Sequence, residues 1–326
     1  MSYGANRTET QITIELGKCA TSIKQTGSGR WEFALNNGSP LGVSARLAED
    51  WLLLDVPVSH RLASEGWFDL LRLNSNLNGL CKFVLRPSAA FGSSTNFGVS
   101  QRSNRDAYLR GELPVAIDEY EDADYDDEVN GRMIRLQETC LGLKTAYHRF
   151  QGEEIFAEQT ASSGGLESRN RLDDIRRLCR DAGWPFIERA AGRLMVDLEV
   201  KGGFYQAAVE QQGEGVRVAV EISSRAQLGA TSRAALSLLL LEIGGRVRLA
   251  RPSIAQDGDH ITACFEVEFT TMPAVVELAH ALASLSVACT LSGREALAIQ
   301  DDLVAKDYLT ILGTQTVLPF SSEAAD

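Results

Sequence analysis

The chain has 326 residues, of which 44% are hydrophobic and 23% are charged. This composition excludes an intrinsically disordered chain, and the length predicts two domains of ordinary size. Acidic residues outnumber basic ones, 44 against 32, and the resulting net charge of -12 argues against a nucleic-acid partner.

The apolar segments are too short for a membrane span, which needs about 20 residues. The longest aliphatic block, Leu236 to Leu241, is interrupted by Ser237, and residues 1–11 lack the apolar segment of a secretory signal. We therefore expect a cytoplasmic protein with no membrane partner. The cysteines form no C-x-x-C pair, and we interpret them as buried structural thiols in preference to disulfides or redox groups. They are Cys19, Cys81, Cys140, Cys179, Cys264 and Cys289.

The first half reads as helix, three strands, helix, two strands, helix. These elements are expected at residues 12–23, 31–35, 41–47, 52–58, 67–74, 79–88, 108–115 and 133–147. The helical stripe of Ile12, Leu16, Cys19 and Ile23 predicts the first helix, and apolar residues at every second position predict the strand at 52–58.

The second half repeats that order about 165 residues later. The elements are expected at residues 172–179, 194–200, 204–209, 216–222, 234–242, 244–253, 261–270 and 275–285. Thr231 or Ser232 is a plausible N-cap for the leucine-rich helix. The sharpest local match sets Arg86-Pro87-Ser88 beside Arg251-Pro252-Ser253, each at the end of an expected strand.

The sequence thus predicts an α+β fold of two tandem α-β-β-β-α-β-β-α domains, each a twisted antiparallel sheet packed with helices. The first domain is expected at 1–160 and the second, with a C-terminal extension, at 168–326. A flexible Ser- and Gly-rich linker at 161–167 separates them. The alternative is one large mixed sheet without a repeat.

Two insertions distinguish the first half from the second. One is a polar loop at 89–105, which we interpret as a mobile excursion between strands. The other is the acidic run Asp118 to Glu128, placed between the last strand and a helix beginning near Gly131. Its Asp122, Asp124 and Asp126 have the first spacings of an EF-hand loop, but the residues that should follow do not fit. We interpret the run as an extended, solvated loop, with docking of a basic partner or loose cation binding as alternatives.

Motifs of catalysis are absent. The chain has no phosphate-binding glycine loop, and Gly42 to Arg46 begins like a nucleophile elbow without its closing glycine. His60, His148, His260 and His280 lack metal-site spacing. We therefore expect no catalytic, cofactor-binding or metal-binding residue and no cofactor. Trp31, Trp51, Trp67 and Trp184 are expected in the core or between the repeats, in preference to an exposed aromatic platform.

The element order resembles the type III secretion chaperone-like fold, which includes the YbjN-like proteins. The resemblance lies in the strands ending at 52–58 or 216–222, the helix ending at Leu73 or Leu241, and the strand pair opening at Gly79 or Gly244. It implies a covalently joined pseudo-dimer without catalytic residues. Secretion chaperones, which are single short domains, bind an extended segment of a partner protein.

These observations favour a non-enzymatic protein-binding or chaperone-like module that holds a segment of a partner protein on exposed sheet edges or apolar patches. The alternative is an enzyme or small-ligand-binding protein with a site between the two repeats, and a third possibility is a structural pseudo-dimer that regulates by assembly. The sequence names no partner, no partner-binding residues and no higher oligomer.

Overall fold

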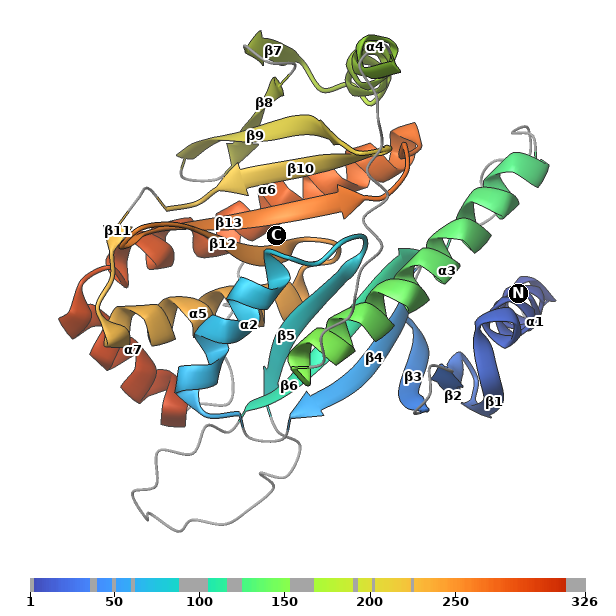
Figure 1. Cartoon of the computed structure of the whole chain (residues 1–326), viewed down its shortest axis with the longest axis horizontal. Helices are drawn as coiled ribbons and strands as arrows, with labels where there is room; N and C mark the ends of the chain where they lie inside the picture. Colours follow the sequence, from blue (N-terminus) through green and yellow to red (C-terminus); the bar gives the residue numbers. More distant parts are fainter. Residues whose placement is uncertain are drawn as a thin grey trace, which may run out of the picture.

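The computed structural model describes residues 3–35, 40–48, 51–59, 62–87, 105–115, 125–152, 167–189, 193–200, 203–223 and 226–314. The fold is α+β in two similar halves, and each half contains its own antiparallel sheet (Figure 1). The expected linker, most of the 89–105 loop and residues 118–124 of the acidic run lie outside the described residues.

The first half contains a six-stranded sheet in the order β1-β2-β3-β4-β6-β5. Its elements are α1 (Tyr3–Cys19), β1 (Ala20–Gly27), β2 (Arg30–Leu35), β3 (Leu41–Ala48), β4 (Trp51–Ser59), α2 (Ser64–Asn74), β5 (Cys81–Pro87), β6 (Arg105–Pro114) and α3 (Tyr125–Phe150). Alternation produces the core, because Trp31, Phe33 and Leu35 of β2 are buried while the residues between them are not.

The second half contains a seven-stranded sheet in the order β11-β13-β10-β9-β8-β7, with β12 also paired to β13. Its elements are α4 (Glu167–Asp181), β7 (Phe186–Arg189), β8 (Arg193–Val200), β9 (Gly203–Gln212), β10 (Gly215–Glu221), β11 (Ala226–Gln227), α5 (Ala230–Arg246), β12 (Arg251–Asp257), β13 (His260–Phe269), α6 (Val275–Ala298) and α7 (Asp302–Thr314).

The meander ahead of the central helix has four strands in each half, so the expected count of three is wrong. The first helix ends at Cys19, and Ile23, which we assigned to its stripe, lies in β1. In the second half β7 is the corresponding extra strand, β11 adds a short pairing, and the C-terminal extension forms α7.

The expected strand at 244–253 is also wrong in its first part. Helix α5 continues through Gly244 and Gly245 to Arg246, and β12 begins only at Arg251. Arg251 therefore opens its strand, whereas Arg86 lies near the end of β5. The Arg-Pro-Ser match is a coincidence of sequence, because its two copies occupy opposite ends of the corresponding strands.

Other boundaries shift by a few residues. Helix α5 begins at Ala230 with Gly229 as its N-cap, so neither Thr231 nor Ser232 has that role. Helix α3 begins at Tyr125 and not near Gly131, so the last four residues of the acidic run belong to its first turn. This part of the run is therefore helical and not an extended loop.

The two halves meet through their central helices. Helix α2 packs on β12 of the other half, α5 packs on β5 of the other half, and α2 and α5 lie side by side (Figure 1). Residues Leu238 to Leu241 of α5 are buried around the whole helix, because sheets and helices from both halves surround it. The fold is therefore a reciprocal pairing of two similar units.

Helix α6 is, among the described helices, the one long and apolar enough by length and composition to cross a membrane. Here it packs on β8, β10 and β13, with Leu278, Leu282 and Leu285 fully buried. These contacts identify its role in the structure as the helix that covers one face of the second sheet.

Gly244 allows the close approach of α5 to β12. A Cβ atom at Gly244 would lie 2.7 Å from Cδ and 2.8 Å from Cγ of Pro252. We expect Gly244→Ala to lower the free energy of unfolding by about 1–3 kcal/mol, since the rigid proline ring must move. Gly17→Ala is the matched control: no atom lies within 4 Å of its Cβ position in α1. That control should gain about 0.5–1 kcal/mol from helix propensity. Denaturant unfolding of both variants measures the difference, and equal shifts would contradict this packing.

Candidate functional site

The interface between the repeats is built around a buried lysine. Lys82 is the second residue of β5 and lies opposite Arg110 of β6. Its Nζ donates across the interface to the carbonyl oxygens of Val247 at 2.7 Å and Ala250 at 3.3 Å. Within its own repeat, Nζ pairs with Glu112 Oε2 at 2.8 Å. Lys82 thus joins its own sheet to the turn that follows α5.

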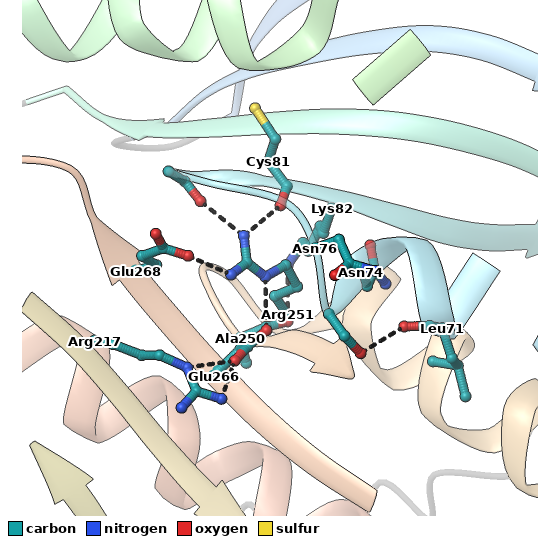
Figure 2. A network of polar contacts seen from close by, with 12 residues as sticks. Leu71, Asn74, Asn76, Cys81, Lys82, Arg217, Ala250, Arg251, Glu266 and Glu268 are labelled. Atoms are coloured by element: carbon teal, nitrogen blue, oxygen red, sulfur yellow. Dashed lines mark hydrogen bonds and ion pairs between the residues drawn. The ribbon is translucent and has the colours of Figure 1, made fainter. Parts of the chain in front are cut away.

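Arg251 of the second repeat makes the corresponding contacts with the first repeat (Figure 2). It is the first residue of β12, and its Nη1 donates to the carbonyl oxygens of Gly79 at 3.1 Å and Cys81 at 3.5 Å. Its Nε and Nη2 bind Glu266 at 3.1 Å and Glu268 at 2.8 Å. Backbone carbonyl groups at the start of β5 therefore accept hydrogen bonds from Arg251. In the same way, carbonyl groups just before β12 accept hydrogen bonds from Lys82.

The two sites correspond position for position. In the second repeat, Arg251 lies opposite Glu266, and Glu268 follows two residues later on the same strand. In the first repeat, Lys82 lies opposite Arg110, and Glu112 follows two residues later. Strand register therefore matches Lys82 with Arg251. At these matched positions each repeat donates from a cation to backbone carbonyls of the other, which binds the two halves together as a pseudo-two-fold pair.

Glu112 also holds a strained part of the second repeat. Its Oε2 accepts a hydrogen bond from the backbone N–H of Leu249 at 2.6 Å. Leu249 has a φ of 59°, and among the described residues it is the only one other than glycine with a positive φ. A left-handed leucine costs about 1–2 kcal/mol, so it persists where surrounding contacts determine it. Removal of Glu112 would release that turn.

Further ion pairs line the same interface. Arg110 binds Asp55 Oδ1 at 2.8 Å through Nε and donates to the Gly245 carbonyl at 2.9 Å through Nη1. Arg105 of β6 pairs with Glu242 of α5, and both are buried. These contacts join β6 to the last turns of α5.

The final helices supply a second zone of contact. Arg135 of α3 binds both carboxylate oxygens of Glu277, at 3.0 and 3.1 Å, and lies 5.2 Å from the centre of the Phe269 ring. In the other direction, His280 of α6 lies 6.1 Å from the Trp51 ring of β4. Trp51 is therefore at the interface between the repeats, as the sequence predicted.

Burial controls the protonation of the two sites. It lowers the pKa of Lys82 to about 8, in opposition to the nearby Glu112 carboxylate, and it raises the pKa of Glu268 despite Arg251. Within the described residues, Arg110 Nη2 and Glu112 Oε1 are buried without a hydrogen-bond partner. The other charged atoms named above bind one another or backbone carbonyls, so the arrangement holds the repeats together and leaves few groups for a substrate.

The second sheet has an outer face that none of the described helices covers over its distal strands. Leu194, Val196 and Leu198 of β8 are fully buried on the face that α6 covers. The alternate residues Arg193, Asp197 and Glu199 are exposed on the opposite, outer face. This half-covered state is typical of antiparallel sheets.

Two large apolar side chains are exposed on that outer face. Ile187 of β7 lies opposite Met195 and is 59% exposed, and Phe204 of β9 lies opposite Glu199 and is 74% exposed. Met195 and Glu199 are four residues apart on β8, so all four side chains lie on the same face. We call the surface formed by Ile187, Met195 and Phe204 the outer apolar surface.

Each sheet also ends in an edge strand that lies far from the interface. β1 is the last strand of the first sheet and β7 the last of the second. The opposite ends, β5 and β12, lie close to each other and contact the central helices. An edge strand presents backbone N–H and C=O groups along one side, and β7 does so next to the outer apolar surface.

Comparisons with known proteins identify no family for this chain. No family model, no curated protein and no solved structure matches the chain. The resemblance to the secretion chaperone-like fold therefore stays an expectation from the sequence, and the structure itself supports the α+β architecture in two similar halves.

The remaining candidate residues are dispersed. His148 lies in α3, His260 is the first residue of β13, and His60 is outside the described residues. No group of three or more His, Cys, Asp or Glu side chains suited to a metal ion occurs in the described part of the chain. Trp31 and Trp67 are buried in the core, which confirms that prediction for them.

The cysteines are free thiols, and five are buried as expected while Cys19 is partly exposed. Sequence reasoning missed the paired cations of the interface. A charged residue in a strand usually indicates the solvent-exposed face of a sheet, and Lys82 and Arg251 are charged residues of strands. The signal that was available is the charge pattern of β6, where Arg110 and Glu112 interrupt the apolar alternation of the strand's second half.

Proposed function

We propose that this protein is a non-enzymatic binding module, which holds an extended segment of a partner protein at the β7 edge and the outer apolar surface of the second repeat. The observation that carries the proposal is the exposure of Phe204 and Ile187 on a sheet face that no helix in the described part of the chain covers. Large apolar side chains on an open face next to a free strand edge are typical of sites that bind a peptide by strand addition.

The chemistry of the surface defines the segment that fits it. A strand added beside β7 would bind its backbone groups, and its alternate side chains would lie on the same face as Ile187. Charged residues of both signs, among them Arg193 and Asp197, surround the apolar side chains. We therefore expect a segment with apolar residues at alternate positions and polar residues between them.

The alternative of a small-ligand site between the repeats has less support. Its charged groups converge, but Lys82 and Arg251 bind carboxylates of their own repeat and carbonyls of the other. A ligand there would have to replace these contacts. Binding at the outer apolar surface needs no such rearrangement.

We expect the protein to stay in the cytoplasm and to bind neither membrane nor nucleic acid.

Site-specific photo-crosslinking tests the proposal. A photoreactive phenylalanine analogue replaces Phe204, and the matched control places it at Leu303 of α7, which is 76% exposed. In native lysate we expect position 204 to capture a defined protein, and the crosslinked peptide to contain alternating apolar residues. Ile187→Asp should abolish that adduct without changing thermal stability. The proposal fails if position 204 captures nothing, or captures the same proteins as position 303.

A further inference from the structure

The first of the two interface sites contains a buried donor and a buried acceptor that bind no described protein atom. Arg110 and Glu112 are two residues apart on β6, so both side chains leave the same face of the strand. Their side chains are 1% and 2% exposed. Among the described residues, Arg110 Nη2 and Glu112 Oε1 have no hydrogen-bond partner. Native proteins rarely leave such atoms unpaired, because each one has lost its hydrogen bonds to bulk water.

Two distances between arginine and carboxylate atoms at this site are too long for a direct hydrogen bond. Arg110 Nη1 lies 3.7 Å from Glu112 Oε1, and Arg248 Nη1 lies 3.9 Å from the same oxygen. Arg248 belongs to the turn that follows α5, so the second distance crosses the boundary between the repeats. The other oxygen differs, since Lys82 and the Leu249 N–H bind Oε2 directly at 2.8 and 2.6 Å. At separations above 3.5 Å, a water molecule can lie between two polar groups.

The chemistry of the surrounding atoms identifies what fits between them. Arginine donates hydrogen bonds and accepts none, and a carboxylate accepts them and donates none. A halide ion could pair with Arg110 but would face the negative oxygen of Glu112, and a metal cation would face two guanidinium groups. A water molecule can accept hydrogen bonds from Arg110 and Arg248 and donate one to Glu112 Oε1. Three hydrogen bonds are also the usual number for a buried water.

We propose that Arg110, Glu112 and Arg248 bind one ordered water molecule, which joins β6 of the first repeat to the turn after α5 in the second. The water accepts from the two guanidinium groups and donates to Glu112 Oε1. Arg248 is 27% exposed, so exchange with bulk solvent passes this side chain. Both oxygens of Glu112 then contact the second repeat, Oε2 directly and Oε1 through the water.

The matching site in the second repeat is dry. Arg251 Nε binds Glu266 Oε1 at 3.1 Å, and Arg217 Nη2 binds Glu266 Oε2 at 2.6 Å. Arg251 Nη2 binds Glu268 Oε2 at 2.8 Å. Within the described residues, no atom of Arg251, Glu266 or Glu268 is buried without a hydrogen-bond partner. The second site therefore provides an internal comparison for the first.

Nuclear magnetic resonance of the full-length chain, labelled with nitrogen-15 in arginine, tests the proposal in solution. The Nε–H group of Arg110 belongs to the same guanidinium as Nη2, so we expect a rotating-frame Overhauser cross-peak between its proton and the water resonance. Arg251 is the matched control, because it is also buried and its Nε–H binds Glu266 directly. It should give no such cross-peak. The proposal is wrong if Arg110 gives none, or if both arginines give cross-peaks of equal intensity.

A high-resolution crystal structure locates the bound species directly. We expect one peak of electron density within about 3.2 Å of both Glu112 Oε1 and a terminal nitrogen of Arg110, and no such peak beside Glu266. Crystals grown with bromide distinguish water from an anion, and an anomalous signal at that position would overturn the proposal. Direct hydrogen bonds from Arg110 and Arg248 to Glu112 Oε1, with no density between them, would overturn it as well.

Discussion

Replacement of Arg251 by alanine is expected to lower the free energy of unfolding by about 3–5 kcal/mol. The change leaves Glu268 buried without its cation and Glu266 with Arg217 alone, and it removes the donor to the Gly79 carbonyl of the other repeat. A buried carboxylate that loses its partner pays the full desolvation cost or becomes protonated. Denaturant unfolding at pH 7 measures the change from the shift in midpoint.

Arg176 is the matched control for that variant. It binds both oxygens of Glu188 with a short, bidentate geometry, but on the surface of the second repeat. We expect Arg176→Ala to leave the unfolding midpoint almost unchanged, because solvent screens exposed ion pairs. Arg251→Lys, which imitates Lys82, should fall between the two. Similar losses for Arg251→Ala and Arg176→Ala would show that the buried site does not hold the repeats together.

Stability is expected to fall steeply as the pH rises above about 9. Burial raises the pKa of Cys81, Cys264 and Cys289 to about 12 and that of Cys179 to about 11, and the pKa of Cys140 is also raised. Above pH 9 the unfolded chain releases these protons and the folded chain keeps them. The folded state then binds more protons, so a rise in pH favours unfolding.

The magnitude follows from proton counting. Each proton kept only by the folded state changes stability by about 1.4 kcal/mol per pH unit. Lys82 acts in the opposite direction, because its pKa is lowered to about 8 and the folded state releases its proton first. Five thiols less one lysine leave four protons, or roughly 5 kcal/mol per pH unit between pH 9 and 10.5.

Unfolding curves at pH 8, 9 and 10 measure that slope. The double variant Cys264→Ala with Cys289→Ala should reduce it by about half, since two of four net protons are removed. Gly17→Ala is the control, because it removes no titrating group and no atom lies within 4 Å of its Cβ position. A stability that stays level from pH 8 to 10 would contradict the burial of these thiols.

The sequence predicted the elements that have one buried and one exposed face. β2 and β8 alternate buried and exposed residues, so their periodicity is visible. β1 and β7 are edge strands with almost every residue at least partly exposed, and polar side chains such as Lys24 and Gln25 leave them no apolar period. The extra strand in each half was therefore missed for the same physical reason.

The interface could not be predicted because its signals resemble those of other structures. Gly244 and Gly245 suggested the end of a helix, but they lie within α5, where a side chain at Gly244 would meet Pro252. Phe204 lies in an expected strand and Ile187 in β7, which was not predicted, and only the sheet register places both on the same outer face. The candidate site thus depends on tertiary pairing that periodicity does not encode.

The central structural claim is that two similar repeats form one cooperative body through reciprocal buried contacts. Production of residues 1–160 and 168–326 as separate chains, alone and together, tests it most directly. Because Lys82 and Arg251 each need carbonyl groups of the other repeat, we expect neither piece to fold alone. Together they should form a one-to-one complex that unfolds in a single transition. A piece that is monomeric and unfolds cooperatively by itself would contradict the claim.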